Sequence, residues 1–457
     1  MSGLWLLQTA AERLAGTRSG LDTPLAQRLV GVLGVAVMIG LAVLLSHDRR
    51  RIDWRLVGGG LLLQVVFGLV VLKTDAGRAF FDQVGSIVTG LLGFQEQGAR
   101  FVFGNLVQST VPVGVPGAGG GLDTSAGYVA ATGSYFAFNV LPTIIFFSAL
   151  MSVLYYLNLM QLVVKGIAWV MQKTLRTSGA ETLSASGNIF LGQTEAPLLI
   201  KPFVPTMTRS ELNTVMVGGF ATVAGGVLAA YVGMLRGWFP DIAGHLLAAS
   251  VMNAPAGLYL SKILMPETET PVTRGTLRMD VEKPGANVID AAASGAGQGM
   301  QLALNVGAML MAFVALVALV NYLLGWVGGF VGQEDLTLQL VLGQVLRPIA
   351  WVMGVPWTET AYVGGLIGIK VVLNEFVAYA QFASQLAADV QISPRSAVIL
   401  TYALLGFANF SSIAIQIGGI GGLAPERRGE IARYGLRAMI AGNLAAFTSA
   451  SIAGMLA

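Results

Sequence analysis

The chain contains no cysteine and only two histidines among its 457 residues. The missing thiols exclude disulfide bonds, iron–sulfur clusters and thiol catalysis. His47 and His245 lie far apart in the sequence and do not form the close ligand pair that a zinc site commonly uses. Charged residues are scarce as well, at 11% against about 25% in an ordinary soluble chain. This low charge excludes a soluble enzyme, a disordered protein and a nucleic-acid-binding protein.

Hydrophobic residues dominate the composition of the chain. They make up 54% of the chain, and the mean hydropathy is +0.70. A helix needs about 20 mostly apolar residues to cross a membrane. We therefore predict an all-α polytopic membrane protein with eight transmembrane helices, at residues 29–46, 55–73, 133–157, 211–235, 243–264, 298–326, 396–420 and 433–455. The 59 glycines are nearly double the usual share of about 7%, which favours close helix contacts and broken helices.

Two further segments, 178–205 and 345–385, are hydrophobic but interrupted by polar and helix-breaking residues. Basic residues cluster on both sides of the first one, in 165–176 and 201–209. Cytoplasmic loops are enriched in Lys and Arg, and both clusters face the cytoplasm only if this segment enters and leaves on that side. The charge pattern therefore predicts two re-entrant helical hairpins of opposite orientation. It also places both termini on the outer, periplasmic side of the plasma (inner) membrane.

Three segments outside the predicted spans carry weaker signals. Residues 76–100 are amphipathic and are predicted to form an interfacial helix. Residues 3–15 are compatible with a second, shorter one, and their apolar run is too short for a signal peptide. The glycine-rich stretch 114–128 is predicted to be a flexible loop.

The two hairpins and the helices after them form an internal repeat. Glu195 lies in the first hairpin, and Thr222 follows in the next helix at the end of the string Gly-Phe-Ala-Thr. Glu375 lies in the second hairpin, and Asn409 follows at the end of Gly-Phe-Ala-Asn. Because the hairpins are predicted to open to opposite sides, the two halves form an inverted repeat. Binding sites in such transporters lie near the middle of the membrane, between the discontinuous elements.

Polar residues at membrane depth define the candidate site. A charged side chain there is costly and indicates a function or a partner. Gly192 and Pro197 weaken the helix beside Glu195. Lys370 is the only basic residue beside the hairpin tips, and it is expected to pair with a carboxylate or to reach toward the membrane surface. The neutral donors and acceptors around the tips predict an uncharged ligand with many hydroxyl and amide-like groups; they are Asn188, Gln193, Thr194, Asn374, Asn409, Ser411 and Ser412.

At these residues the sequence resembles the concentrative nucleoside transporter family, and its bacterial members in particular. Residues 368–378, Gly-Ile-Lys-Val-Val-Leu-Asn-Glu-Phe-Val-Ala, match the family signature G-x-K-x-x-x-N-E-F-V-A. Gly192–Pro197, Gly406–Ser412 and Glu282–Ala292 also resemble motifs of this family. The similarity extends over residues 30–455, which is almost the entire chain.

The resemblance implies a homotrimer that takes up nucleosides by ion symport. Each protomer would combine a scaffold domain with a mobile transport domain that moves like an elevator. Residues 1–175 and 267–330 would form the scaffold. Residues 176–266 and 340–457, which hold the two halves of the repeat, would form the transport domain.

The resemblance also implies roles for individual residues. Gln193, Thr194 and Glu195 would face the nucleobase. The ribose would be held by Glu375, Asn409 and Ser412, with Phe407 packed beside the ligand. A carboxylate can accept hydrogen bonds from two vicinal hydroxyls, and such charge-assisted bonds are the stronger kind. An amide can both donate to and accept from the edge of a base.

Sodium-coupled relatives hold the ion between the first hairpin and the fourth span. The matching positions here are the side chains of Asn188 and Thr222 and the backbone carbonyls of Leu191 and Val223. Neutral oxygens of this kind suit a hard monovalent cation. Proton-coupled relatives lack the intact set, so the resemblance favours sodium, with proton symport as the alternative. It implies no organic cofactor.

Two other classes of function remain open on the residues alone. Glu195 and Glu375 would be the acid–base pair of a membrane-embedded enzyme, although neither a metal cluster nor a Ser–His arrangement accompanies them. A passive channel is the second class, but hairpins from both faces favour alternating occlusion over an open pore. We therefore predict a secondary active transporter, not an enzyme. Its partners would be a nucleoside, the lipid bilayer and other copies of the chain, without nucleic acid.

Overall fold

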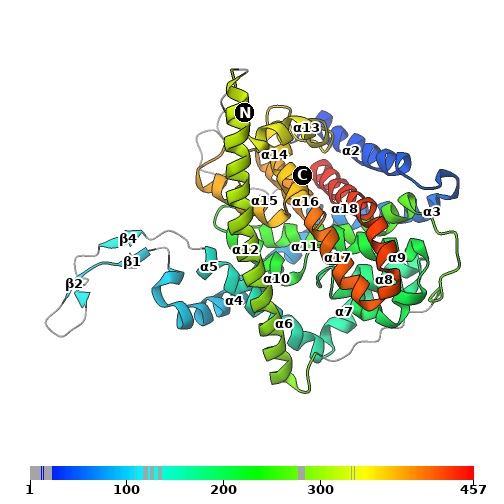
Figure 1. The fold of residues 1–457 in the computed structure, drawn as a ribbon, viewed down its shortest axis with the longest axis horizontal. Coiled ribbons are helices and arrows are strands. Elements are labelled where there is room, and N and C mark those ends of the chain that lie inside the picture. The colour runs from blue at the N-terminus through cyan, green and yellow to red at the C-terminus, as the bar shows by residue number, and fades with distance from the viewer. Residues whose placement is uncertain are drawn as a thin grey trace.

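Nearly all of the described part of the chain is helical (Figure 1), which confirms the predicted all-α class. The computed structural model describes residues 12, 14, 23–108, 110–116, 122–123, 128–131, 136–275, 284–330, 332–333 and 335–457. The helix proposed for residues 3–15 lies almost wholly outside the described residues. The first two residues of the motif Glu282–Ala292 lie outside them as well.

The helices follow the order of the predicted segments. Before the first hairpin they are α2 (Leu25–Leu44), α3 (Trp54–Lys73), α4 (Asp75–Phe103), α5 (Phe136–Asn139), α6 (Leu141–Tyr156) and α7 (Leu159–Leu175). The first half of the repeat contains α8 (Gly179–Gly187), the 3-10 helix η4 (Ala196–Thr206), α9 (Arg209–Ala221), α10 (Gly225–Leu235) and α11 (Ile242–Leu264). Then come α12 (Val288–Gly329), α13 (Leu338–Val352), α14 (Thr360–Val372), α15 (Glu375–Ala387), α16 (Pro394–Leu404), α17 (Phe410–Leu423) and α18 (Arg428–Leu456). Short 3-10 turns are η2 (Arg49–Arg51), η3 (Gly104–Val107) and η5 (Pro425–Arg427).

The glycine-rich region after α4 contains short strands, where the sequence predicts only a loop. β1 (Thr110–Pro112) pairs with β4 (Val129–Ala131), and β2 (Val115–Pro116) pairs with β3 (Leu122–Asp123), both antiparallel. Valines in three of these strands favour extended structure. The strands lie beyond α4, away from the main helical body (Figure 1). The amphipathic helix predicted at 76–100 is present as α4, and its place at a membrane surface stays a prediction.

Six helices in the described part of the chain are long and apolar enough to cross a membrane, by length and composition. They correspond to six of the eight predicted spans. The other two predicted spans are covered by α11, which carries buried polar residues such as Asn253, and by the pair α16 and α17. The full number of eight crossings therefore stays a prediction.

Two of the predicted spans are not continuous helices, as the sequence predicts, but pairs of shorter helices. Residues 222–224 separate α9 from α10, and residues 405–409 separate α16 from α17. Hydropathy does not reveal these breaks, because the residues on both sides are apolar. Gly406 has a φ of +113°, and a Cβ there would lie 2.7 Å from the Phe220 carbonyl oxygen. Only glycine fits this conformation and this close approach.

The second interrupted segment also begins later than its predicted start. Pro348 lies inside α13, a separate helix that packs along α14. The helix pair that contains Glu375 is therefore α14 and α15, from Thr360 to Ala387.

α2 and α3 pack closely against α11 and α18. α2 packs along α18, and α3 packs along α11 and α18. A Cβ on Gly60 of α3 would lie 2.6 Å from the Tyr259 ring, so the two helices touch through the missing side chain. Gln64 of α3 is fully buried, donates to the Ser449 hydroxyl (2.8 Å) and accepts from the Tyr259 hydroxyl (2.9 Å). Close packing and buried hydrogen bonds make this contact rigid.

A second group of helices is built on α6 and α12. α12 is 42 residues long and crosses the molecule beside the other helices (Figure 1). Gly295 and Gly299 of α12 face Ser152 and Ser148 of α6, where an added Cβ would lie 2.6 and 2.8 Å from the serine Cβ atoms. Small residues thus allow the two backbones to approach closely.

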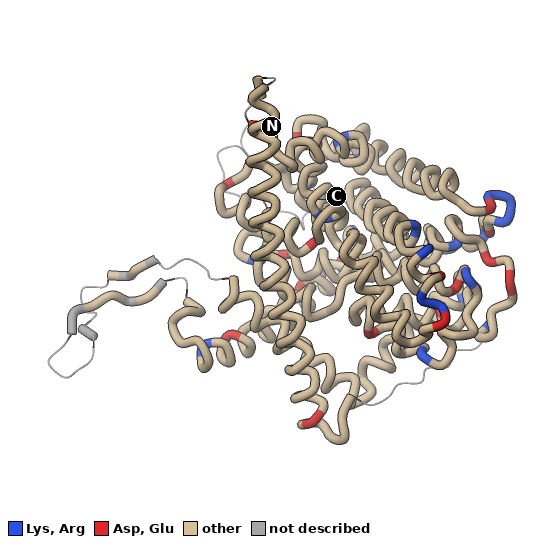
Figure 2. Tube along the Cα trace, viewed as in Figure 1, with Lys and Arg blue, Asp and Glu red and all other residues tan. Residues whose placement is uncertain are grey.

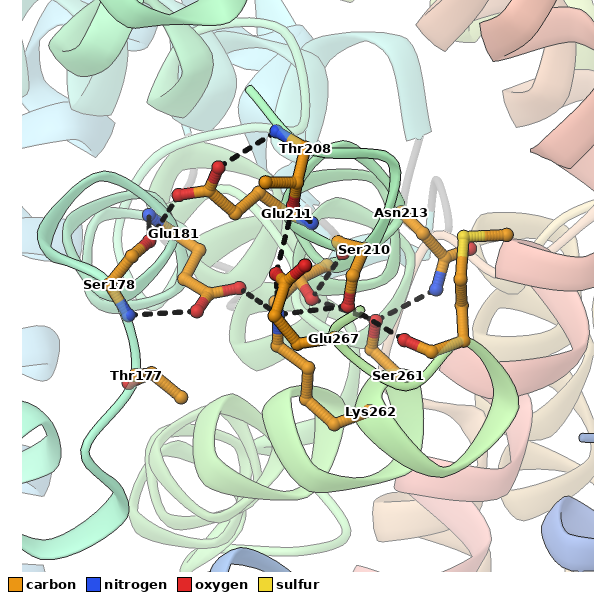
Figure 3. Close-up of polar contacts among 12 residues, drawn as sticks. Thr177, Ser178, Glu181, Thr208, Ser210, Glu211, Asn213, Ser261, Lys262 and Glu267 are labelled. Atoms are coloured by element: carbon orange, nitrogen blue, oxygen red, sulfur yellow. Dashed lines mark hydrogen bonds and ion pairs between the residues drawn. The ribbon is translucent and has the colours of Figure 1, made fainter. Parts of the chain in front are cut away.

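Charged residues are sparse along the helices and gather at one end of the molecule, around the loop between α2 and α3 and beside α8 and α9 (Figure 2). Two capping boxes lie in this region. Ser178 and Glu181 cap α8, and Thr208 and Glu211 cap α9. The Ser178 hydroxyl donates to the Glu211 carboxylate, which joins the two helix starts (Figure 3).

Lys262 connects this polar cluster to the end of α11. Its ammonium lies 2.8 Å from Glu181 Oε2 and 3.2 Å from Glu267 Oε2, and it donates to the Ser210 hydroxyl at 2.9 Å (Figure 3). The Lys262 and Glu181 side chains are 6% and 1% exposed. The starts of α8 and α9 and the end of α11 are therefore held together by a buried ion pair and by hydrogen bonds.

Candidate functional site

The predicted hairpins correspond to two pairs of consecutive helices that pack against each other. α8 and η4 are joined by residues 188–195, and α14 and α15 are joined by Leu373 and Asn374. Asn374 caps α15 by accepting a hydrogen bond from the Val377 N–H (2.8 Å). The chain therefore leaves helical geometry at both positions that the repeat marks. The re-entrant course of the two pairs in a membrane stays a prediction.

The breaks in the helices after the hairpins meet each other. Phe407, in the break between α16 and α17, donates its N–H to the carbonyl of Thr222, in the break between α9 and α10 (3.3 Å). The Gly225 N–H donates to the carbonyl of Phe190, beside the first hairpin tip (2.8 Å). Non-helical backbone from both halves of the repeat is thus brought to one place, where ions and substrates bind in transporters of this architecture.

Glu375 and Asn409, which the repeat marks in its second half, lie in direct contact. The Asn409 amide donates to Glu375 Oε2 at 2.9 Å, and the Tyr231 hydroxyl donates to Glu375 Oε1 at 3.0 Å. The Glu375 side chain is buried, with 4% of the residue exposed. Two of its four acceptor positions are used by these neutral donors, so it can accept further hydrogen bonds.

Tyr231 has no signal in the sequence that marks it for the site. It lies 144 positions from Glu375, and no matched residue of the second half points to it. Its ring stacks on that of Tyr379, with centroids 4.3 Å apart. An aromatic residue in an apolar helix normally indicates packing. Tyr231 could therefore not be predicted as a site residue from the sequence alone.

Asn409 has a second role in its own helix. Its side-chain oxygen accepts from the Ser412 N–H (2.9 Å) and from the Ser411 hydroxyl (2.7 Å), which caps α17. The cap fixes the rotamer that aims the Asn409 amide at Glu375. Ser411 therefore bonds within its own helix start.

The sequence suggests that Lys370 pairs with a carboxylate or reaches toward the membrane surface, but its side chain is fully buried and forms no ion pair with a described residue. Its ammonium donates to the carbonyls of Ala403 (2.9 Å) and Leu405 (3.4 Å) at the end of α16. The last carbonyls of a helix have no partners within it, and a cation satisfies them well. This buried lysine therefore stabilises the break in the seventh span.

Gln193 and Ser412 are joined across the two halves of the repeat. Gln193 Nε2 donates to the Ser412 hydroxyl at 3.1 Å, and Gln193 Oε1 accepts from Gln416 Nε2 at 3.1 Å. Gln416 also donates to the Met216 carbonyl (3.0 Å). Gln416 is not among the residues predicted from the sequence, although its spacing of one helical turn from Ser412 is a usable signal.

Thr194 and Glu195 have contacts different from those of Glu375. The Thr194 hydroxyl donates to Glu195 Oε1 at 3.3 Å. Glu195 lines a cavity of about 610 Å³ between the first hairpin, the start of α10, and the α6 and α12 pair. Tyr155 and Gln298 line the same cavity. The two hairpin carboxylates therefore have different surroundings: that of Glu195 borders a cavity, and that of Glu375 is enclosed by donors.

The predicted sodium ligands lie together around the first break. Asn188 is fully buried, and neither side-chain polar atom has a hydrogen-bond partner among the described residues. A Cβ on Gly218 would lie 3.2 Å from the Asn188 amide nitrogen, and the Thr222 hydroxyl donates to the Gly218 carbonyl at 2.9 Å. Leu191 and Val223 lie outside the helices, beside these residues in sequence.

This arrangement fits a monovalent cation. The Thr222 hydroxyl gives its proton to a carbonyl, so its oxygen lone pairs remain for another group. The buried Asn188 amide needs a partner, since a buried polar atom without one is costly. The described residues contain no cluster of three or more His, Cys, Asp or Glu side chains that could hold a metal ion. Neutral oxygens are therefore the ligands that this part of the chain offers.

Comparison with known families covers most of the chain. Residues 33–106 match the description "Na+ dependent nucleoside transporter N-terminus", residues 137–238 match "Nucleoside recognition", and residues 245–454 match "Na+ dependent nucleoside transporter C-terminus". These ranges include both interrupted segments and both helix breaks described above.

Individual relatives are similar over nearly the whole sequence. An uncharacterized transporter of Haemophilus influenzae is 46% identical over 430 residues, which are 93% of this chain and 97% of that protein. Sodium/nucleoside cotransporter 1 of Mus musculus is 41% identical over 94% of this chain, and the match covers 64% of that longer protein.

Solved structures agree in fold. CNTnw in an inward-facing substrate-bound state is 46% identical with a TM-score of 0.82, and the match covers 94% of this chain and 97% of that one. A variant of CNTnw in an outward-facing state gives a TM-score of 0.83 over 94% and 97% of the two chains, at 46% identity. Sequence and fold agree on a family of multi-pass membrane transporters rather than of enzymes. The chain belongs to the Na+-dependent nucleoside transporter family.

Proposed function

We propose that this protein is a sodium-coupled nucleoside symporter that drives uptake across the plasma (inner) membrane. Membership of the family supports nucleoside transport as the activity. The observation that carries the choice of sodium is the buried, unpartnered amide of Asn188 beside the Thr222 hydroxyl. With the carbonyls of Leu191 and Val223, these groups would supply four neutral oxygens to the ion.

The substrate would bind between the first hairpin and the two broken helices. Glu375, Asn409 and Ser412 would hold the ribose hydroxyls, because a carboxylate and an amide fixed 2.9 Å apart offer adjacent hydrogen-bonding groups. Gln193 and Glu195 would bind the base, with Thr194 beside them and Phe407 against the ligand. A bound nucleoside would replace the hydrogen bonds among Gln193, Ser412 and Gln416 with hydrogen bonds to itself.

A backbone hydrogen bond supports the coupling of ion and substrate. Thr222 offers its side chain to the ion, and its carbonyl accepts from Phe407, two residues before Asn409. An ion that orders the break at Thr222 would thereby order the segment that binds ribose. Two ligands that stabilise one arrangement bind cooperatively, and each raises the affinity of the other by the same factor.

The transport step would be an elevator movement of one domain against a scaffold within a homotrimer. The helix contacts favour a different boundary from the one predicted at residue 175. α2 and α3 are interlocked with α18 and α11, so we place them with the transport domain. α6 and α12 would form the scaffold, which the 610 Å³ cavity separates from the first hairpin. Both termini would face the periplasm.

Uptake into sealed vesicles tests the proposal. Purified protein in liposomes should accumulate labelled uridine or adenosine against its gradient when an inward sodium gradient is imposed. A proton gradient without sodium should give no accumulation. Uptake driven by pH alone would establish proton symport in place of sodium symport. Equilibration without accumulation under either gradient would indicate a passive channel and would contradict both forms of symport.

A further inference from the structure

A second cavity lies far from the hairpins, at the end of the molecule where charged residues gather. It measures about 510 Å³ and lies between the loop after α2, the start of α9, the end of α11 and the first turns of α18. We call it the basic pocket, after the arginines in its wall: Arg209, Arg433 and Arg437. None of the residues proposed for nucleoside or sodium lines it.

The arginines of the basic pocket are poorly neutralised by the protein. Arg433 and Arg437 lie one helical turn apart on α18, and neither forms an ion pair with a described residue. Like charges at this spacing destabilise a helix. Arg209 has only Glu430, at 3.7 Å, and its side chain is 72% exposed, so that contact contributes little. Glu430 is also the partner of Arg427, at 2.6 Å.

Acidic residues in the lining do not cancel this charge. Asp48 already accepts from the Arg50 N–H and lies 3.5 Å from the Arg51 guanidinium. Glu269 is the other acidic residue of the wall. The lining therefore holds three arginines and two acidic residues, of which Asp48 is already paired. The general enrichment of basic residues in cytoplasmic loops explains their side of the membrane, but it does not explain why they converge on one cavity.

Six of the other ten lining residues are apolar, and the remaining four are His47, Ser210, Thr268 and Tyr434. Leu264, Leu436 and Ile440 line the pocket, and Leu45 at the end of α2 is 46% exposed beside them. Ile440 lies nearly one helical turn beyond Arg437 on α18, toward the apolar part of that helix. The pocket thus offers positive charge at the end of the bundle and hydrocarbon surface next to it. A free inorganic anion would use only the first of these.

We propose that the basic pocket binds the headgroup of an anionic phospholipid from the cytoplasmic leaflet. Arg433 and Arg437 would hold the phosphate, since a guanidinium matches its geometry with two parallel hydrogen bonds. The acyl chains would lie along Leu436 and Ile440. Basic pockets between membrane helices on the cytoplasmic side recognise lipid headgroups in this way.

The lipid would tie the loop after α2 to α9 and α18. This loop is already anchored by one backbone bond, from the His47 N–H to the Leu264 carbonyl (2.9 Å). A headgroup bound by α18 and next to His47 would add a second connection. Binding should therefore raise the thermal stability of the protein, because a ligand of the folded state stabilises it.

Native mass spectrometry and thermal unfolding of the detergent-purified protein test this site. Phosphatidylglycerol should remain bound and raise Tm by several degrees, whereas phosphatidylcholine should do neither. In the double variant Arg433→Gln with Arg437→Gln, affinity for phosphatidylglycerol should fall at least tenfold. Lys165→Gln with Lys173→Gln is the matched control. It removes the same charge from α7, which is outside the pocket, and should leave lipid binding unchanged.

Three results would overturn the proposal. One is equal binding of the two lipids, and another is undiminished binding of phosphatidylglycerol by the Arg433 and Arg437 variant. The third is an equal Tm shift from inorganic phosphate alone, which would make the pocket a site for a free anion. None of these readouts depends on nucleoside transport.

Discussion

At the scale of single residues, the proposed nucleoside site depends on a Glu375 carboxylate that can still accept hydrogen bonds from a ligand. The hydrogen bonds that its oxygens accept come from two neutral groups, the Tyr231 hydroxyl and the Asn409 amide. Lys370 is directed to the end of α16 by its bonds to carbonyls. These two donors leave acceptor positions of the carboxylate open for a ligand, and hydrogen bonds to a charged acceptor are about twice as strong as neutral ones.

Glu375→Gln should greatly weaken nucleoside binding. The change replaces a charged acceptor by an amide of similar shape, and hydrogen bonds to charged groups contribute about 1.5–3 kcal/mol. Uridine affinity, measured by calorimetry at saturating sodium, should fall roughly 10- to 100-fold. A 2′-deoxyribose nucleoside should lose less, because it has one hydroxyl fewer to offer.

The matched control is Tyr231→Phe, which removes one donor to Glu375 and leaves the carboxylate in place. It should cost about 1 kcal/mol or less in uridine affinity. If Glu375→Gln binds uridine like the unchanged protein, or if both nucleosides weaken equally, the ribose assignment is wrong.

Thr222→Val should lower the apparent affinity for sodium. Valine keeps the shape of threonine but removes the oxygen that we assign to the ion. The sodium concentration that gives half-maximal uridine binding should rise about tenfold, which corresponds to about 1.4 kcal/mol.

Thr401→Val provides a control from the other half of the repeat. The Thr401 hydroxyl is also buried and donates to the carbonyl four residues earlier, that of Ala397, at 2.9 Å. Its loss should leave the sodium dependence unchanged. Equal shifts in the two variants would show that the Thr222 effect is one of helix stability and would remove Thr222 from the sodium site.

At the scale of elements, the site depends on short helices whose ends are fixed by side chains. Asn374 caps α15, which begins at Glu375, and Asn409 caps α17. In the first half, the buried polar cluster around Lys262 holds the starts of α8 and α9 (Figure 3). Asn188 lies directly after α8 and Thr222 directly after α9. The cluster therefore fixes the positions of the two helices that precede these residues.

Lys262→Met should destabilise the protein strongly. Glu181 would be left buried without its cation, and breaking a buried ion pair costs about 3–5 kcal/mol. Thermal unfolding of the purified protein should show a large decrease in Tm.

Arg51→Met is the control for that change, because its pair with Asp48 is 61% and 39% exposed. Exposed pairs contribute about 0–1 kcal/mol. If the two variants lose the same stability, the buried cluster does not hold the helix starts together.

At the scale of the whole molecule, the repeat made much of the site predictable, whereas contacts without a pattern were not. Matched strings identify Glu375 with Asn409, and the structure joins them. They do not identify Tyr231, whose bond to Glu375 connects positions 144 apart. Hydropathy also predicts helices 211–235 and 396–420 as continuous, because a break lined by apolar residues leaves average hydropathy unchanged. The local geometry of Gly406 and the bonds of Lys370 to the Ala403 and Leu405 carbonyls account for the second break.

The absence of cysteine offers a direct test of which helices move together. A cross-link between α10 and α6 can be made with Gly226→Cys and Phe147→Cys, where the Cβ atoms would lie 3.8 Å apart. A second can join α3 to α11 with Gly60→Cys and Tyr259→Cys, at 3.1 Å. Disulfides usually have Cβ separations of about 3.5–4.5 Å, so the first fits directly and the second needs a small adjustment.

Oxidation should affect the two cross-linked proteins differently. The α10–α6 bond connects the proposed transport domain to the scaffold and should abolish sodium-driven uridine uptake, with recovery after reduction. The α3–α11 bond lies within the proposed transport domain. Uptake by this protein should therefore be the same before and after oxidation. Loss of uptake in both proteins would return α3 to the scaffold, as the boundary at residue 175 predicts. Full uptake with α10 bonded to α6 would contradict an elevator movement along this interface.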